Sequence, residues 1–246
     1  MRFLFLSLLS LLSIDALAYT DLITTPNSAR QTFSIQFADI TPVATATDVI
    51  TITGQTGKVI RINKLEVTGD ATGVGVVDFY FYKRFTTNTG GTSTSQLAVE
   101  HDSQWPIDNI ITNTGFVIGQ TYIISGTSTA CNTIGASANT IGIIFIATAT
   151  SASTCIATES TYASIKLYSA NPSALGYGQL IRANHYALPA ATATGYPGAP
   201  WVEEFGTRND QELVLRGPNE SLSFNLGGAT LPAGLNVYVA ITWTEE

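Results

Sequence analysis

The sequence predicts an all-β fold, a jelly-roll-like sandwich of two sheets that carries a small β insertion module. The first observation is the segment 235–243, where apolar and polar residues alternate almost without exception. Side chains alternate across a strand with period two, so this segment is a strand with one face on a core. The second observation is that the same pattern recurs along the chain, and no convincing helical periodicity interrupts it.

The recurring pattern places the strands at a spacing that is typical of a sandwich or jelly roll. Within 58–68 the alternation slips by one residue at Asn63-Lys64, which predicts a β-bulge. The segment 86–95 is rich in Thr, Ser, Asn and Gly, and its composition predicts a loop. The predicted strands are 32–37, 48–53, 58–68, 75–84, 97–101, 163–169, 178–187, 212–216, 221–226 and 235–243.

Alternation also predicts which side chains form the core, because the apolar positions of each strand share one face. The residues expected to be largely buried are Phe79, Phe81, Leu213, Leu215, Leu222, Phe224, Val237, Val239, Ile241 and Trp243.

The composition changes in the middle of the chain, and this change sets the predicted domain boundaries. No charged residue occurs from Thr112 until Glu159, and the stretch consists mostly of small and hydroxyl residues with isoleucine. We interpret 112–160 as a small β module inserted into a loop, with main strands at 121–125 and 142–148. The sandwich is then formed by 32–111 and 161–246, after a leader at 1–18 and a polar arm at 19–31.

The overall composition limits the classes of function. Hydrophobic residues make up 45% of the chain, which excludes a disordered protein, but only 12% of residues are charged, about half the usual share. A Thr, Ser, Asn and Gly surface suits an extracellular or virion protein. The net charge of −7 and the scattered basic residues, with Lys83-Arg84 the one adjacent pair, argue against a nucleic-acid partner.

The N-terminus has the pattern of a secretory signal peptide. Arg2 supplies a positive charge, an apolar run follows to Ile14, and Ala16-Leu17-Ala18 has the small-x-small form of a cleavage site. The apolar run is shorter than the roughly 20 residues of a membrane span, so we expect no transmembrane segment. The alternative is an uncleaved apolar helix that anchors the protein to a partner.

The two cysteines of the chain, Cys131 and Cys155, both lie in the predicted insert. If the chain is exported, we expect them to form a disulfide; in a reducing cytosol they would be two free thiols. Neither has the spacing of a zinc or redox site. A disulfide that closes this loop would stabilise the chain by about 3.5 kcal/mol in the chain-entropy treatment.

No catalytic site, metal site or cofactor is predicted. Glu100-His101-Asp102 is a sequence of acid–base residues, but neighbours on a strand point to opposite faces, so solvated charges at a strand end are expected. His185 is expected to be a half-buried polar residue of a strand. Glu203-Glu204 are adjacent and therefore unsuited to attack one substrate from both sides. The motifs of hydrolases, zinc proteases, phosphate loops and calcium loops are absent from the sequence.

Aromatic residues in Pro/Gly segments are the candidates for a binding surface on loops. Trp105 precedes a proline, and Tyr196 and Trp201 flank the segment Pro197-Gly198-Ala199-Pro200. Such residues stack on sugars or anchor a protein interface, or they cap the open end of a sandwich. Both interpretations remain open from the sequence.

Several motifs outside the insert are specific enough to compare with known families: Lys83 to Thr92 (KRFTTNTGGT), His101-Asp102-Ser103, Leu213 to Gly217 (LVLRG), Asn225-Leu226, Leu231 to Leu235 (LPAGL) and Trp243 to Glu246. Together they resemble a family of small proteins of tailed bacteriophages and prophages, usually labelled uncharacterised or virion structural. The insert, with Gly119 to Ile124, Ile134 to Gly142 and Phe145 to Thr148, resembles a short repeat of phage tail and fibre proteins. The leader and the cysteine pair depart from this pattern.

The resemblance implies a non-enzymatic virion structural or surface protein that acts in assembly, decoration or attachment. Its expected partners are further copies of itself, other virion proteins and a host surface glycan, and its expected location is the virion or the extracellular space. The apolar face of Tyr80 and Tyr82 is the expected surface for self-association. The alternatives are a secreted bacterial carbohydrate-binding or adhesive module and, third, an enzyme such as a glycan hydrolase.

Overall fold

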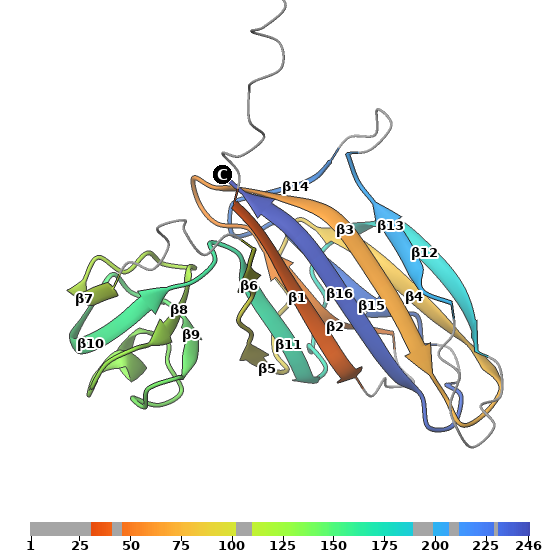
Figure 1. The fold of residues 1–246 in the computed structure, drawn as a ribbon, viewed down its shortest axis with the longest axis horizontal. Helices are drawn as coiled ribbons and strands as arrows, with labels where there is room; N and C mark the ends of the chain where they lie inside the picture. The colour runs from red at the N-terminus through yellow and green to blue at the C-terminus, as the bar shows by residue number, and fades with distance from the viewer. Residues whose placement is uncertain (1–30, 41–45, 102–109, 189–198, 207–211, 229–230) are drawn as a thin grey trace, which may run out of the picture. The chain divides into compact units, whose positions relative to one another are not determined.

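The structure, a computed structural model, describes residues 31–40, 46–101, 110–188, 199–206, 212–228 and 231–246 (Figure 1). The described chain is all-β, with antiparallel sheets and one short 3₁₀ turn, Cys131–Ile134. Within these ranges no helix has the length and apolar character needed to cross a bilayer. The predicted leader and all but the last residue of the predicted arm lie outside the described residues.

Two six-stranded antiparallel sheets form the sandwich. The first has the order β13-β3-β16-β1-β6, with β14 also paired to β3, and the second has the order β12-β4-β15-β2-β11-β5. The strand bounds are β1 Gln31–Ile40, β2 Thr47–Thr53, β3 Val59–Asp70, β4 Gly75–Arg84, β5 Thr92–Ser95, β6 Val99–Glu100, β11 Ser164–Ala170, β12 Gly178–Leu188, β13 Trp201–Glu204, β14 Leu213–Arg216, β15 Ser221–Leu226 and β16 Asn236–Glu245.

The connectivity of these strands is that of a jelly roll. In the first sheet the C-terminal strand β16 lies between β1 and β3, and in the second sheet β15 lies between β2 and β4. The strands β13 and β12 then flank β3 and β4, so the C-terminal half of the domain interleaves with the N-terminal half (Figure 1). This arrangement confirms the predicted fold class.

The predicted irregularity in β3 is a β-bulge. Along the pairing of β3 with β16, Lys64 is opposite Thr242 but Ile62 is opposite Trp243, so Asn63 is the extra residue. Because of this bulge, both Ile62 and Leu65 point to the core, although they lie an odd number of residues apart. The slip in the hydrophobic pattern therefore had a backbone cause.

The core lies between the two sheets and contains nearly all the residues that alternation predicted. Nine of the ten are buried, and Leu213 is half-buried and packs against the same cluster. Trp243 is fully buried and stacks on Phe33, with 5.9 Å between the ring centroids. Phe224 lies between Phe79 and Phe81, at 5.5 and 5.3 Å. The first pair of rings joins β1 to β16 in one sheet, and the second group joins β4 to β15 in the other, and all five belong to the same buried cluster.

The module is part of the long connection from β4 to β12. Its four strands are β7 Ile110–Thr114, β8 Thr121–Ile124, β9 Ile144–Ile146 and β10 Ser151–Glu159. They form a separate sheet of order β7-β10-β8-β9 with its own hydrophobic cluster. Before and after this sheet, the connection supplies β5, β6 and β11, which extend the edges of the sandwich.

Four strands were not predicted: β5 and β13 of the sandwich, and β7 and β10 of the module, whose expected main strands were 121–125 and 142–148. β5 occupies part of the segment 86–95, whose composition predicted a loop, and β13 follows the Pro/Gly segment. β5 has the sequence Thr-Ser-Thr-Ser and lies exposed at the edge of the sheet. Since neither of its faces is buried in the core, its sequence shows no alternation of apolar and polar residues. It is a strand because its backbone pairs with β11. Edge strands of this kind leave little signal in the hydrophobic pattern.

Candidate functional site: the inserted module and its junction with the sandwich

The module has a small core that is closed by the predicted disulfide. Cys131 and Cys155 are both fully buried and bonded, and their α-carbons lie 4.8 Å apart. Asn113 has a positive φ of 64°, and its side-chain oxygen accepts a hydrogen bond from the Cys155 amide at 3.2 Å. The intrachain pairing expected from the sequence is thus confirmed. Asn113 of β7 holds Cys155 in place through its side-chain oxygen.

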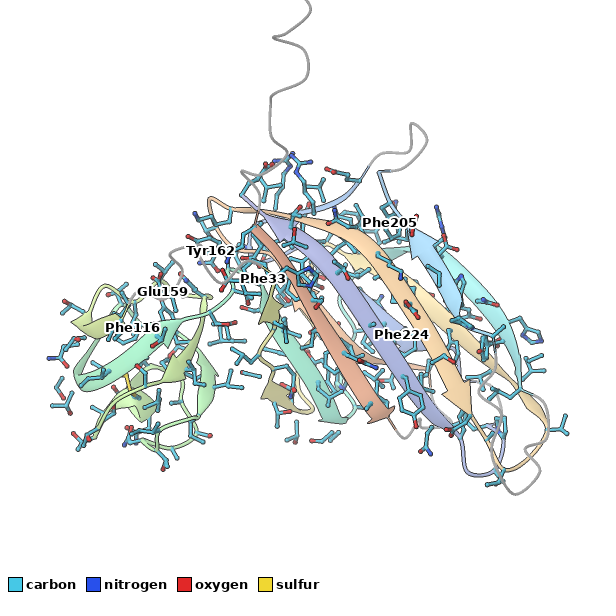
Figure 2. The ribbon with its side chains drawn as sticks, in the orientation of Figure 1. Phe33, Phe116, Glu159, Tyr162, Phe205 and Phe224 are labelled. Carbon is cyan, nitrogen blue, oxygen red and sulfur yellow. A yellow bond between two sulfur atoms is a disulfide. The ribbon has the colours of Figure 1, made fainter. Side chains whose placement is uncertain are left out.

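Three aromatic rings are the largest side chains of this core, which otherwise contains isoleucine, alanine and the disulfide. Tyr122 packs on Phe116 and on Phe145, with 5.1 and 5.7 Å between ring centroids. Its hydroxyl accepts a hydrogen bond from the Val117 amide at 2.9 Å. Burial raises the pKa of Tyr122 to about 12, so this phenol stays neutral and serves packing rather than proton transfer. Phe116 is labelled on the module in Figure 2.

The module contacts the sandwich through polar side chains and backbone groups. Thr121, at the start of β8, donates its hydroxyl proton to the Ala163 carbonyl at 3.0 Å. The Gln55 amide of the sandwich donates to the Ile118 carbonyl at 2.8 Å, and the Ser164 hydroxyl donates to the Gly119 carbonyl. Because Gln55 and Thr121 are buried, these bonds are shielded from water.

A carboxylate lies at the centre of this junction. Glu245, near the end of β16, is 4% exposed and accepts hydrogen bonds from the Tyr162 and Ala163 amides at 2.7 and 3.1 Å. It also accepts one from the Trp243 indole at 2.8 Å. Burial raises the pKa of Glu245 to about 7, and the three hydrogen bonds and the charge of Lys58 oppose this shift.

A cavity of about 170 Å³ lies on another side of the same junction. Phe33, Leu97, Ala98 and Ile123 supply its apolar wall, and Glu100 and Glu159 add two carboxyl groups from the two parts of the chain. Figure 2 shows Phe33 and Glu159 in this region, with Tyr162 on the segment that follows the module. Apolar walls with carboxylates suit the stem and head of a basic side chain.

A second buried polar cluster lies on the outer face of the second sheet. Arg84 binds Asp48 through two nitrogens, at 3.0 and 2.7 Å, and the amides of Asn88 and Asn225 also donate to Asp48, at 2.9 and 2.7 Å. Arg84 and Asn88 hold Gly176 by its carbonyl and its amide, at 3.1 and 2.8 Å. This network binds the loops after β4 and before β12 to the sheet, and Asp48 is completely buried.

The aromatic residues predicted on loops are placed differently. Trp105 and Tyr196 lie outside the described residues. Trp201 begins β13, packs on Phe81 at 5.4 Å and donates its indole proton to Glu203 at 3.0 Å. Its ring therefore covers the edge of the sandwich core.

The acid–base residues singled out in the sequence lie apart. Glu100 pairs opposite Phe33, and the His101 ring lies 2.9 Å from the Ser34 hydroxyl, while Asp102 is outside the described residues. His185 contacts Asp78 at 2.5 Å, and its side chain is 74% exposed. The prediction of a half-buried histidine was wrong because this face of the edge strand β12 is open to solvent.

Sequence reasoning missed Glu245, although the signal was present. Position 245 continues the inward phase of Val239, Ile241 and Trp243, so an acid there was already placed on the buried face. Asp48 and Gln55 gave no such signal, because their burial comes from loops that are distant in sequence.

The described residues contain no group of three His, Cys, Asp or Glu side chains suited to hold a metal ion. No protein-family model matches the sequence, and no curated protein or solved structure is significantly similar to it. The junction and the module therefore have to be interpreted from their own geometry.

Proposed function

We propose that this chain is a non-enzymatic structural or surface protein of a tailed-phage virion, with the inserted module carried on a jelly-roll scaffold. The observation that carries the proposal is the architecture itself. A jelly roll, a fold used by viral capsid and lectin domains, holds a disulfide-closed module in the connection between β4 and β12. The motifs that resemble phage and prophage proteins lie in both parts of the chain.

The buried polar groups support a structural rather than a catalytic role. The Asp48–Arg84 network holds two loops, and the Glu245 group holds the module, so each has its partners within the chain. The polar surface of the module consists mainly of Thr, Ser, Asn and Gly, with Glu159 as its one charged residue, which suits contact with a neutral glycan or another protein surface. A disulfide is compatible with the proposed virion or extracellular location.

Self-association is part of this proposal, with further virion proteins and a host surface glycan as the other partners. Leu180 on β12 is an apolar side chain on the described surface with an exposure of 49%. It pairs with Tyr82 on β4, and the Tyr82 ring contacts Tyr80, so Leu180 adjoins the face predicted for self-association. Light scattering of the pure protein should give a mass above that of the 26.1 kDa chain.

The test is to purify virions from a phage or induced prophage whose genome carries this gene. Peptide mass spectrometry should find the chain in particles banded in a density gradient, and immunogold labelling should place it on the capsid or tail. Intact-mass measurement would also show whether residues 1–18 remain. Recovery of the chain only from the particle-free supernatant would contradict the proposal.

The second candidate is a secreted carbohydrate-binding or adhesive module. The observation that favours it is the exposed Tyr177 ring, which packs on Phe85 at 6.0 Å and presents a free face. Aromatic rings on a surface stack on sugars. Retardation of the wild type, but not of Tyr177→Ala, in polysaccharide affinity gels, together with absence of the chain from purified virions, would support this candidate over the virion protein.

A further inference from the structure

We infer that Glu245 is a proton-sensitive latch that holds the exit of the inserted module against the terminal strand of the sandwich. The inference goes beyond the proposed function, since it concerns a contact within this chain and needs no partner. It rests first on geometry: one buried carboxylate joins three N–H groups from two parts of the molecule.

The position of the latch determines what it controls. Tyr162 and Ala163 are the last two of the four residues between β10 of the module and β11 of the sandwich. Their amides both point to the Glu245 carboxylate, and the Ala163 carbonyl accepts bonds from Thr121 of the module and from Thr161, at 3.0 and 2.8 Å. Loss of the carboxylate contacts would thus free the segment that leads out of the module.

The surroundings of Glu245 show why it responds to protons. From the turn before β3, Lys58 lies over the Tyr162 ring at 3.9 Å, and it is the cation that acts on Glu245. The neighbouring Glu246 is bound to Arg61 of β3, which also binds Glu212. On the β1 side, the residue opposite Glu245 is the neutral Gln31. Among the described residues, no Lys, Arg or His side chain forms a salt bridge with Glu245 itself.

The direction of the response follows from linkage. Burial raises the pKa of Glu245 to about 7, whereas an undocked module would leave the group in water with an ordinary value near 4.5. The docked state therefore binds the proton more tightly, and docking is strongest below about pH 4.5 and weakens as pH rises through 7. The difference between the pKa of Glu245 in the docked state and in the undocked state corresponds to a change in the docking equilibrium on the order of 100-fold.

The test uses the full chain labelled with ¹⁵N. The Trp243 indole and the Tyr162 and Ala163 amides should shift together between pH 4 and 9, with one common midpoint near 7. Their hydrogen-exchange protection, corrected for the intrinsic pH dependence, should fall on the order of 100-fold over this range if they exchange by undocking. The wild type alone supplies this result, so a variant that fails to fold does not obscure it.

Glu245→Gln is the matched variant, and Glu66→Gln, which changes a half-buried glutamate paired with Lys64, is the control. Glu245→Gln mimics the protonated carboxyl, so it should abolish the common titration and retain at pH 9 the protection of Tyr162 and Ala163 that the wild type shows at pH 5, while Glu66→Gln should titrate as the wild type does. Common midpoints below pH 5, or a loss of protection with rising pH that persists in Glu245→Gln, would overturn the inference.

Discussion

The sandwich and the module reach stability by different means. The sandwich buries a cluster of 29 residues in which aromatic and branched aliphatic side chains dominate, and only two are alanine. The module buries 12, of which five are alanine and two are the disulfide cysteines. A large apolar area stabilises the first part, whereas the second has too little core and depends on a covalent link. The difference shows why the cysteines lie only in the module.

The largest effect should come from the core of the sandwich. Trp243→Ala removes the largest fully buried side chain, its stacking on Phe33 and one hydrogen bond to Glu245. We expect the free energy of unfolding to fall by about 3–5 kcal/mol, measured by urea titration. Trp201→Ala, at the half-buried edge, should cost less. A loss below about 1 kcal/mol for Trp243→Ala would contradict its place in the core.

The disulfide should matter for the module alone. The double change Cys131→Ser and Cys155→Ser should lower the free energy of unfolding of the module by about 3.5 kcal/mol, because the unfolded loop regains its freedom. Hydrogen exchange resolved by residue would show lost protection in β7 to β10 and retained protection in β15 and β16. Equal losses in both regions would show that the two parts unfold as one unit.

The pH dependence of stability tests the contact between the two parts. The pKa of Glu245 is raised to about 7 in the folded chain, so the native state binds more protons than the unfolded state between pH 4.5 and 7. The contribution of this group to the free energy of unfolding is therefore greatest below pH 4.5. It falls by on the order of 3 kcal/mol as pH rises to 7. Thermal unfolding of the wild type and Glu245→Gln across this range would isolate it as their difference.

The smallest effect should come from a contact that belongs to neither core. His185→Ala removes the contact with Asp78 on the open face of β12. An exposed pair of this kind contributes little, so we expect a change below about 0.5 kcal/mol at pH 6. Urea titration provides the measurement, and Asp78→Asn is the matched change on the other side. A loss above 1 kcal/mol would show that this face is covered in solution, for example by a second copy.

Several features could be predicted from the sequence because they depend on local periodicity. Alternation correctly predicted both ends of β15, the inward face of β16 and the bulge at Asn63. The change in composition after Thr112 marked the module, whose strands run from Ile110 to Glu159. Edge strands such as β5 escaped prediction, since nothing in a run of Thr and Ser requires one face to be buried.

The sequence by itself determined the all-β class, the inward faces of the long strands and the presence of two cysteines in one charge-free segment. Only the tertiary structure decided which buried polar groups meet: Asp48 with Arg84, Gln55 with Ile118, and Glu245 with the segment that leaves the module. The physical reason is that alternation is a property of a single strand. A buried carboxylate, by contrast, is matched mainly by donors that the fold brings from 36 to 177 residues away along the chain.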